Sequence, residues 1–268
     1  MQGPVRLTRG NRVIYTFALP KGGTGKTICA AEGVYYLSRL GRRVLAIDLD
    51  QQGNLSHRLG LTKDAEIKYG TAQVLTAIAD AADAAVPALS ISADVVPHVL
   101  VGTHELAAVE SQPPADLVTT LRDHLPSIAG EYDDIVIDTP PSATGLALAG
   151  LAAADVVIAP VATATESYDQ LERLDAILAV TLGKRINPGI SIGWVMPTRF
   201  DQRRILDREV VEAISKHYPG RVTVPIREAV TVKDSYTAAL TISSYRPTAP
   251  VALDYAAAFA QIMPEGNL

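Results

Sequence analysis

The sequence predicts an α/β protein whose mostly parallel sheet carries helices on both faces. Short runs rich in Val, Ile and Leu alternate along the chain with longer stretches of helical spacing, a pattern typical of βαβ units. Apolar residues make up 48% of the chain but aromatic residues only 5%, which favours small aliphatic side chains packed between parallel strands and helices. Because 268 residues without repeats or long linkers suit one large core, we expect residues 1–268 to form a single domain.

The expected elements follow one another in βα order, with right-handed crossovers between the parallel strands. Strands are expected near residues 12–19, 43–48, 93–97, 134–138, 155–160, 190–197 and 221–224. Helices are expected near residues 26–40, 71–82, 115–129, 143–153, 166–182, 202–217 and 250–263. The segment from Asp80 to Leu89 is rich in alanine with scattered acids, and we expect it to be a mobile surface connection.

A glycine-rich turn follows the first expected strand. Lys21-Gly22-Gly23-Thr24-Gly25-Lys26-Thr27 joins that strand to a helix, which is the context of a phosphate-binding loop. Backbone N–H groups of such a loop surround phosphate oxygens, and the helix N-terminus favours negative charge. Lys26 is expected to reach the β- and γ-phosphates, and the Thr27 hydroxyl to ligate Mg²⁺. The residues expected to hold the nucleotide are Lys21, Gly22, Gly23, Thr24, Gly25, Lys26, Thr27 and Ile28.

The loop departs from the ordinary pattern at two positions. Pro20 stands where the common rule asks for glycine, and Lys21 adds a second lysine to the loop. Two lysines on one short loop suit a phosphate site if both face phosphate charge; the alternative is a solvated lysine at a turn. The loop resembles the deviant Walker A loop, KGGxGK[ST], of the ParA/MinD group of P-loop ATPases, although Pro20 replaces a residue that is usually polar there. The resemblance implies that Lys21 crosses a dimer interface to the partner's nucleotide.

Two further segments carry the same resemblance. Residues 43–54 are similar to the family's VLLIDLDPQGN segment, with Gln51 in place of the usual proline, and residues 132–142 are similar to its YDYIIIDxPPS Walker B segment. The likeness is strong over residues 12–60 and 130–162 and weak after about residue 190. The chain resembles the short form of ParA partition ATPases, which lacks an N-terminal helix-turn-helix, because its first expected strand begins so early.

Three carboxylates are expected at the carboxyl ends of neighbouring parallel strands, where ligands bind in open α/β sheets. Asp138 is the candidate Mg²⁺ ligand, acting through water, and Asp48 either assists with the metal or fixes Thr27 and the loop. Asp50 points the same way as Asp48 in an extended chain. The resemblance implies that Asp50 orients or activates the attacking water; the alternative is a helix N-cap ahead of residues 54–56. The catalytic set is therefore expected to be Lys21, Lys26 and Asp50, and the metal set Thr27, Asp48 and Asp138.

The resemblance implies a switch driven by ATP and Mg²⁺. ATP is expected to close a two-fold homodimer, and hydrolysis, slow and stimulated by a partner, to open it. The expected cargo is plasmid or chromosomal DNA, partitioned with a ParB-type centromere-binding protein. We expect the protein to be cytoplasmic and associated with the nucleoid.

Non-specific DNA binding is also expected. The net charge of −5 argues against a strongly basic protein, so the phosphate contacts would have to come from a local basic patch. The expected DNA contacts are Arg199, Arg203, Arg204 and Arg227. The alternative is a solvated helix face beside Asp201, Asp207 and Glu209. By the weak likeness in this region, Thr198 and Pro225 are expected near the adenine.

Membrane and disulfide-bonded classes fit the sequence poorly. Residues 144–164 carry one charge, Asp155, but their pattern favours an Ala-rich helix and a buried strand over a membrane span. Met1–Asn11 has no apolar segment of the kind a signal peptide needs. Cys29 is the only cysteine, which fits a reducing compartment, and we expect it to be a small core residue.

The same residues can be compared with four other functions. Cys29 alone cannot ligate the iron–sulfur cluster of a nitrogenase-type reductase. Residues 256–268 contain no Lys or Arg, unlike the cationic amphipathic helix that a MinD-like membrane ATPase needs. A ligase of the dethiobiotin synthetase type would have no reason for the segment at residues 48–54. A ParA-like ATPase that positions another cargo, such as a protein compartment or a receptor cluster, remains open as an alternative.

Overall fold

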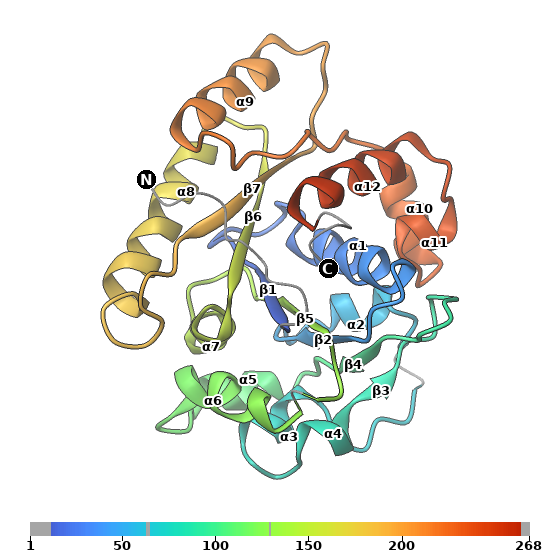
Figure 1. The fold of residues 1–268 in the computed structure, drawn as a ribbon, viewed down its shortest axis with the longest axis vertical. Helices are drawn as coiled ribbons and strands as arrows, with labels where there is room; N and C mark the ends of the chain where they lie inside the picture. The colour runs from blue at the N-terminus through green and yellow to red at the C-terminus, as the bar shows by residue number, and fades with distance from the viewer. Residues whose placement is uncertain (1–11, 63–64, 129, 264–268) are drawn as a thin grey trace.

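The computed structural model describes residues 12–62, 65–128 and 130–263 (Figure 1). Its centre is a seven-stranded sheet with the strand order β3-β4-β2-β5-β1-β6-β7. The strands are β1 (Val13–Phe17), β2 (Val44–Asp48), β3 (Val86–Pro87), β4 (His98–Leu100), β5 (Asp134–Asp138), β6 (Val156–Ala162) and β7 (Ile192–Thr198). Neighbouring strands are parallel except for the short edge strand β3, which is antiparallel to β4. The predicted fold class is therefore confirmed.

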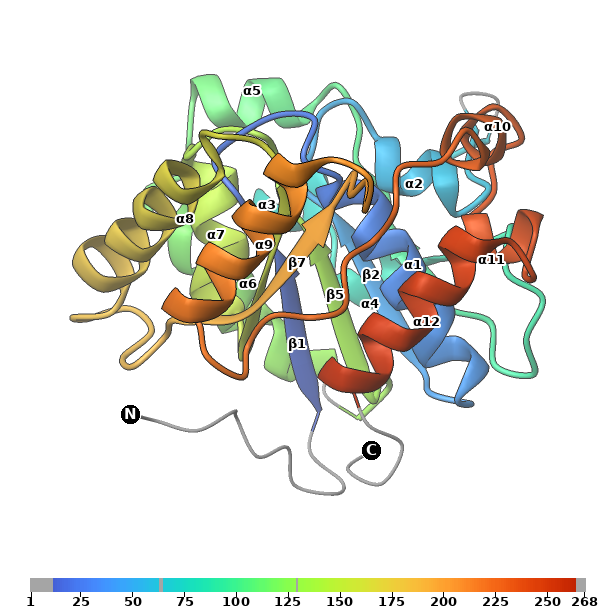
Figure 2. The same cartoon turned by 90° about the horizontal axis from the view of Figure 1, so that it is seen from above.

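Helices cover both faces of the sheet. They are α1 (Lys26–Arg39), α2 (Asn54–Arg58), α3 (Thr71–Leu75), α4 (Ala81–Ala84), α5 (Leu106–Ser111), α6 (Leu117–His124), α7 (Gly145–Ala153), α8 (Ser167–Ala176), α9 (Ile205–His217), α10 (Thr231–Thr237), α11 (Ile242–Tyr245) and α12 (Pro250–Ile262). Figures 1 and 2 show α1, α10, α11 and α12 on one face and α6, α7 and α8 on the other. A 3₁₀ turn (Leu125–Ile128) follows α6, and a π-helical segment (Ile177–Leu182) follows α8.

The central strand β1 divides its side chains between two cores. Tyr15 and Phe17 are fully buried and pack with α1 and α12, whereas Ile14 packs on the opposite face with α6 and α7. This alternation is the period of two that a strand imposes on its side chains. Cys29 lies fully buried in the first of these cores, as predicted.

The strand register brings the predicted acidic residues to one edge of the sheet. Phe17, the last residue of β1, pairs with Asp138 of β5, and Asp138 pairs in turn with Asp48 of β2. The loop that follows Phe17 therefore leaves the sheet beside both carboxylates. This arrangement agrees with the sequence-based expectation that ligands bind at the carboxyl ends of the strands.

Several expected elements differ in the structure. The strand expected at 93–97 is wrong, because β4 begins only after Pro97, which has no N–H to donate and whose carbonyl accepts a bond from Ala88 N at 2.8 Å. Residues 80–89 are not a loose connection, since Ala81 and Ala84 of α4 are buried and β3 follows directly. The strand expected at 221–224 is reduced to one isolated bridge between Val195 and Val222.

The apolar stretch at residues 144–164 forms α7 and β6, so the expected Ala-rich helix and buried strand are confirmed. Among the described residues, no helix is both long and apolar enough to cross a membrane. The expectation for Met1–Asn11, and the part of the C-terminal expectation that concerns residues 264–268, lie outside the described residues.

Candidate nucleotide-binding site

The glycine-rich loop between β1 and α1 forms one wall of a cavity of about 480 Å³. Gly23 and Gly25 adopt φ angles of 74° and 95°, which residues other than glycine rarely adopt. Gly25 also stands directly before α1, and its carbonyl accepts the first helical bond from Cys29 N at 2.9 Å. The cavity is lined by Gly22, Gly23, Thr24, Gly25, Lys26, Thr27 and Ile28 of this loop and helix. These are seven of the eight residues expected to hold the nucleotide; Lys21 is the exception.

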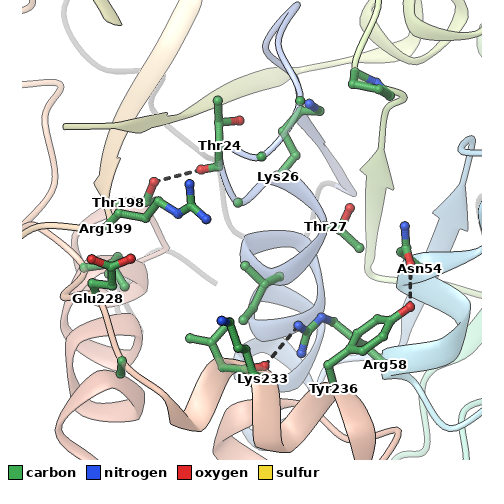
Figure 3. Close-up of a pocket in the computed structure, with 18 of the residues that line it drawn as sticks. Thr24, Lys26, Thr27, Asn54, Arg58, Thr198, Arg199, Glu228, Lys233 and Tyr236 are labelled. Atoms are coloured by element: carbon green, nitrogen blue, oxygen red, sulfur yellow. Dashed lines mark hydrogen bonds between the residues drawn. The ribbon is translucent and has the colours of Figure 1, made fainter. Parts of the chain in front are cut away.

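Lys26 is a buried cation and the first residue of α1. Its side-chain ammonium donates to the Lys21 carbonyl at 2.7 Å, so the loop itself fixes the position of the charge. Figure 3 shows Lys26 where the loop meets α1. Burial lowers the pKa of Lys26, while the Asp138 and Asp50 carboxylates act in the opposite direction. A desolvated cation on a glycine-rich loop that lines a cavity is suited to hold phosphate oxygens.

Asp48 organises the segment that follows β2. Its Oδ2 accepts bonds from Ser56 N at 2.9 Å and Ser56 Oγ at 2.8 Å, and its Oδ1 accepts from Asp50 N at 3.1 Å. Burial raises the pKa of Asp48 to about 6. A Cβ on Gly102 would lie 2.7 Å from Asp48 Cγ, so glycine is required beside this carboxyl. These bonds hold α2 against the sheet, a role that differs from the two expected from the sequence, which were to assist with the metal or to fix Thr27 and the loop.

Asp138 is a fully buried carboxyl that lies near Thr27 and Lys26. Within the described residues, neither of its oxygens receives a hydrogen bond of ordinary geometry. Burial and then the neighbouring Asp48 raise the pKa of Asp138, while Thr27 and Lys26 lower it. A buried carboxylate oxygen without a hydrogen-bond partner is suited to accept a hydrogen bond from a metal-bound water.

The donor set fits Mg²⁺ better than a metal that demands a full protein cage. Among the described residues, no group of three or more His, Cys, Asp and Glu side chains could hold a metal ion. Mg²⁺ usually keeps several waters and takes one or two carboxylates plus phosphate oxygens. Thr27 and Asp138, with a bound nucleotide, supply that kind of set.

Asp50 lines the cavity next to the loop and is 9% exposed. Its Oδ1 accepts a bond from Gln52 N at 3.0 Å. The N-cap of α2 is Gly53, which adopts φ 61° and provides no side-chain cap. The alternative role of Asp50 as a helix cap is therefore wrong, and its carboxylate belongs to the cavity.

Lys21 turns away from the cavity. Its ammonium pairs with Glu166, just before α8, at 2.5 Å, and the two side chains are 35% and 56% exposed. Lys21 is not among the residues that line the cavity. The single chain thus contains one lysine at the phosphate-binding wall and holds the other on an adjacent acid.

The wall next to the loop, at the end of β7, contains some of the residues expected at the adenine and the DNA. Thr198 Oγ1 donates to the Thr24 carbonyl at 2.7 Å, which ties the end of β7 to the loop. Arg199 lines the same cavity. Pro225 does not line it, and instead borders a neighbouring hollow of about 490 Å³ with Arg203, Arg204 and Arg227. Arg227 borders both.

Two of these arginines carry compensated charges. Arg203 makes paired hydrogen bonds to Asp201 at 2.9 and 2.8 Å, and Arg227 makes paired bonds to Asp254 at 2.6 and 2.7 Å. Arg204 lies more loosely, with 3.8 Å between its Nε and Asp201. Three of the four arginines expected to contact DNA therefore border one hollow, with acids among them, and DNA binding stays a prediction.

Sequence reasoning missed the part of the cavity made by α2 and α10. The Tyr236 hydroxyl donates to Asn54 Oδ1 at 2.8 Å, and the Arg58 guanidinium lies over the Tyr236 ring at 5.0 Å. Lys233 and Val232 complete this wall (Figure 3). No local pattern indicated these contacts, because the two helices are far apart in sequence and α10 falls where the family resemblance is weak.

A phosphate-binding loop between the first strand and first helix of a parallel sheet defines the class of P-loop nucleotide-binding proteins. A family model described as an AAA domain matches residues 12–192. The chain is 32% identical over 242 residues to the chromosome-partitioning ATPase Soj of Thermus thermophilus, covering 88% of this chain and 89% of that protein. The chain therefore belongs to the ParA/Soj family of P-loop ATPases.

Solved structures share the fold over most of the chain. The ATP complex of McdA from Cyanothece has a TM-score of 0.82 at 21% identity, covering 94% of this chain and 96% of that one. Cobyrinic acid a,c-diamide synthase from Mycobacterium smegmatis, with a bound ATP analogue and magnesium, has a TM-score of 0.73 at 27% identity and covers 91% of each chain.

Proposed function

We propose that this ATPase is a nucleotide-driven dimerisation switch that hydrolyses ATP with Mg²⁺ at the loop between β1 and α1. The proposal rests chiefly on the buried Lys26 ammonium, which lies on the glycine-rich loop that lines the cavity. A polyphosphate bound there would compensate a charge that burial disfavours. The ATP analogue and magnesium of the M. smegmatis structure support the same ligands here.

The metal site would be formed by Thr27 and Asp138, with Asp48 behind them as the residue that holds α2. When bound, Mg²⁺ supplies charge neutralisation on the phosphate oxygens. In this assignment Asp138 acts through water, because its carboxyl lies beneath the cavity and does not line it.

Asp50 would position the attacking water. It lines the cavity beside Lys26 and Thr27, and its bond from Gln52 N at 3.0 Å restricts the orientation of the carboxylate. Phosphoryl transfer needs positioning and charge stabilisation more than covalent chemistry. Fixed carboxylate geometry is therefore the expected contribution of this residue.

The dimer would form when Lys21 leaves Glu166 and reaches the nucleotide of a second chain. An isologous contact through the nucleotide makes this exchange reciprocal, and loss of the γ-phosphate on hydrolysis removes the charge that holds both lysines. A cation acting in trans at the transition state is worth roughly 10³–10⁵ in rate in other phosphoryl-transfer enzymes.

The cargo would be chromosomal or plasmid DNA, held without sequence specificity at the nucleoid of the cytoplasm and released with a ParB-type partner. The name of the Soj relative, a chromosome-partitioning ATPase, favours DNA over a protein compartment or receptor cluster. We also propose that residues 1–268 act as a single domain.

The proposal is tested by two variants with opposite expected effects. Lys26→Ala should abolish binding of ATP and ADP, measured with fluorescent nucleotide analogues. Asp50→Ala should bind ATP with near-normal affinity but lose most of its turnover. Tight nucleotide binding by Lys26→Ala, or normal turnover by Asp50→Ala, would show that the roles assigned here are wrong.

A further inference from the structure

Arg199 differs from the other arginines expected to contact DNA. It lines the nucleotide cavity and not the neighbouring hollow that contains Arg203 and Arg204. It directly follows Thr198, whose hydroxyl is bonded to the Thr24 carbonyl at 2.7 Å. Arg199 thus lies in the same cavity as Thr24 of the phosphate-binding loop (Figure 3). Its position therefore indicates a ligand within the cavity.

The backbone of Arg199 is held in an unusual conformation. Its φ angle is 56°, in the left-handed region that residues with a Cβ adopt only at an energetic cost. Contacts on both sides maintain it: Thr163 Oγ1 donates to the Arg199 carbonyl at 3.3 Å, and Phe200 N donates to the Ile226 carbonyl at 3.0 Å. Strain that the surroundings maintain in this way is found preferentially at ligand-binding sites.

The charge of Arg199 is available for a ligand. Asp201 and Asp254 occupy the guanidinium groups of Arg203 and Arg227. In the described part of the chain, no hydrogen bond or ion pair engages the Arg199 guanidinium. Guanidinium groups bind phosphate oxygens through paired N–H donors, and the adjacent loop is the phosphate-binding wall of the cavity.

From these observations we propose that Arg199 contacts the polyphosphate of the nucleotide bound in its own chain. The inference rests on the nucleotide site proposed above and adds a contact to it. It reassigns Arg199 from the DNA surface to the nucleotide, and leaves Arg203, Arg204 and Arg227 as the candidate DNA contacts.

The test measures the affinity of fluorescent ATP and ADP analogues in the absence of DNA. Arg199→Ala should raise the Kd for ATP by about tenfold or more, because a charge-assisted hydrogen bond is lost. Arg199→Lys, which keeps the charge, should recover part of that affinity. Arg203→Ala is the matched control and should bind ATP as the unchanged protein does. The melting temperature of each nucleotide-free variant reports whether the fold is intact.

Three results would overturn the inference. The first is unchanged ATP affinity in Arg199→Ala, and the second is an equal loss in Arg203→Ala. The third is a loss that Arg199→Lys does not relieve and that is as large for adenosine as for ATP, since it would assign Arg199 to the base. Lys26→Ala separates this inference from the proposed function. If Lys26→Ala loses ATP binding while Arg199→Ala keeps it, only the contact by Arg199 is wrong.

Discussion

At the residue level, the main feature of the site is a group of buried ionisable side chains. Lys26 is 6% exposed, and Asp48 and Asp138 are fully buried. Burial shifts the pKa of each toward its neutral form. Because an uncompensated buried charge is costly, the cavity favours a ligand that brings both phosphate anions and a metal cation. The same residues thus account for the pairing of nucleotide with Mg²⁺.

The pair between Lys21 and Glu166 leads to a prediction about regulation. In the single chain this pair holds the lysine that the proposed switch needs at the partner's nucleotide. Glu166→Gln should free Lys21, so ATP-dependent dimers should form at a roughly two- to fivefold lower protein concentration, a small effect because the pair is exposed. Sedimentation with a non-hydrolysable ATP analogue measures this.

Glu212→Gln is the matched control for that experiment. It removes an exposed acid that pairs with Lys216 at 2.7 Å on α9, away from the loop. The control should dimerise as the unchanged protein does. If Glu166→Gln and Glu212→Gln dimerise at the same protein concentration, Glu166 does not restrain Lys21 in the switch.

Much of the site at this scale could be predicted from the sequence, because its signals are local. The glycines and lysine of the loop occupy a fixed spacing, and Asp48 and Asp138 end apolar runs that pair in register. The partner of Lys21 could not be predicted. Glu166 is 145 positions away, and an exposed acid near a turn gives no sign of what it pairs with.

At the scale of elements, α11 is anchored by a buried acid on α1. Glu32 accepts bonds from Ile242 N at 2.5 Å and from Ser243 N and Oγ at 3.3 and 2.5 Å. Burial raises the pKa of Glu32 to about 7, against an ordinary value of 4.5. These bonds fix the first residues of α11 to the helix that begins at the phosphate-binding loop.

Glu32 should make the stability of the protein depend on pH. A carboxyl whose folded pKa is raised favours the folded state below its unfolded pKa, and this contribution is lost as pH rises through the folded pKa. The free energy of unfolding should therefore fall between about pH 4.5 and pH 7, by on the order of 3 kcal/mol for this group.

Glu32→Gln should remove that part of the pH dependence. Urea unfolding of the nucleotide-free protein at pH 5 and pH 8 provides the comparison. Relative to the variant, the unchanged protein should be most stable at pH 5, where Glu32 is neutral, and should lose stability as Glu32 ionises toward pH 8. Parallel stability curves for the two proteins would exclude a titrating Glu32.

The elements that could be predicted are those with strong local patterns. β1, α1, β2, β5, β6 and α12 lie where apolar runs or helical spacing indicate them. The short helices α2, α10 and α11 could not be predicted, because long-range contacts define them. Arg58 of α2 donates to the Val232 carbonyl of α10 at 3.3 Å, and such contacts leave no periodic signal.

For the whole molecule, the net charge is −5, so DNA binding would depend on local positive charge at the candidate DNA surface. Arg203 and Arg204 are 85% and 60% exposed, and Asp201 lies between them. Phosphate contacts would have to compete with this acid, so DNA binding should be strongly salt-dependent.

The double variant Arg203→Glu with Arg204→Glu should abolish retention on DNA in the presence of ATP while leaving nucleotide affinity unchanged. Lys216→Glu, in the last turn of α9, the helix that Arg203 and Arg204 precede, is the control and should retain DNA. Electrophoretic or surface-capture measurements at two salt concentrations provide the readout. DNA retention that survives the double variant would move the surface elsewhere on the molecule.

The central claim is that Lys21 of each chain serves the nucleotide of the other. Lys21→Ala and Asp50→Ala should each hydrolyse ATP poorly alone. In an equal mixture, a mixed dimer contains one complete site, formed by the pocket of the Lys21→Ala chain and the lysine of the Asp50→Ala chain. We expect the mixture to recover about a quarter of the unchanged protein's rate, because half the dimers are mixed and each has one active site. A mixture no faster than the sum of its parts would contradict the claim.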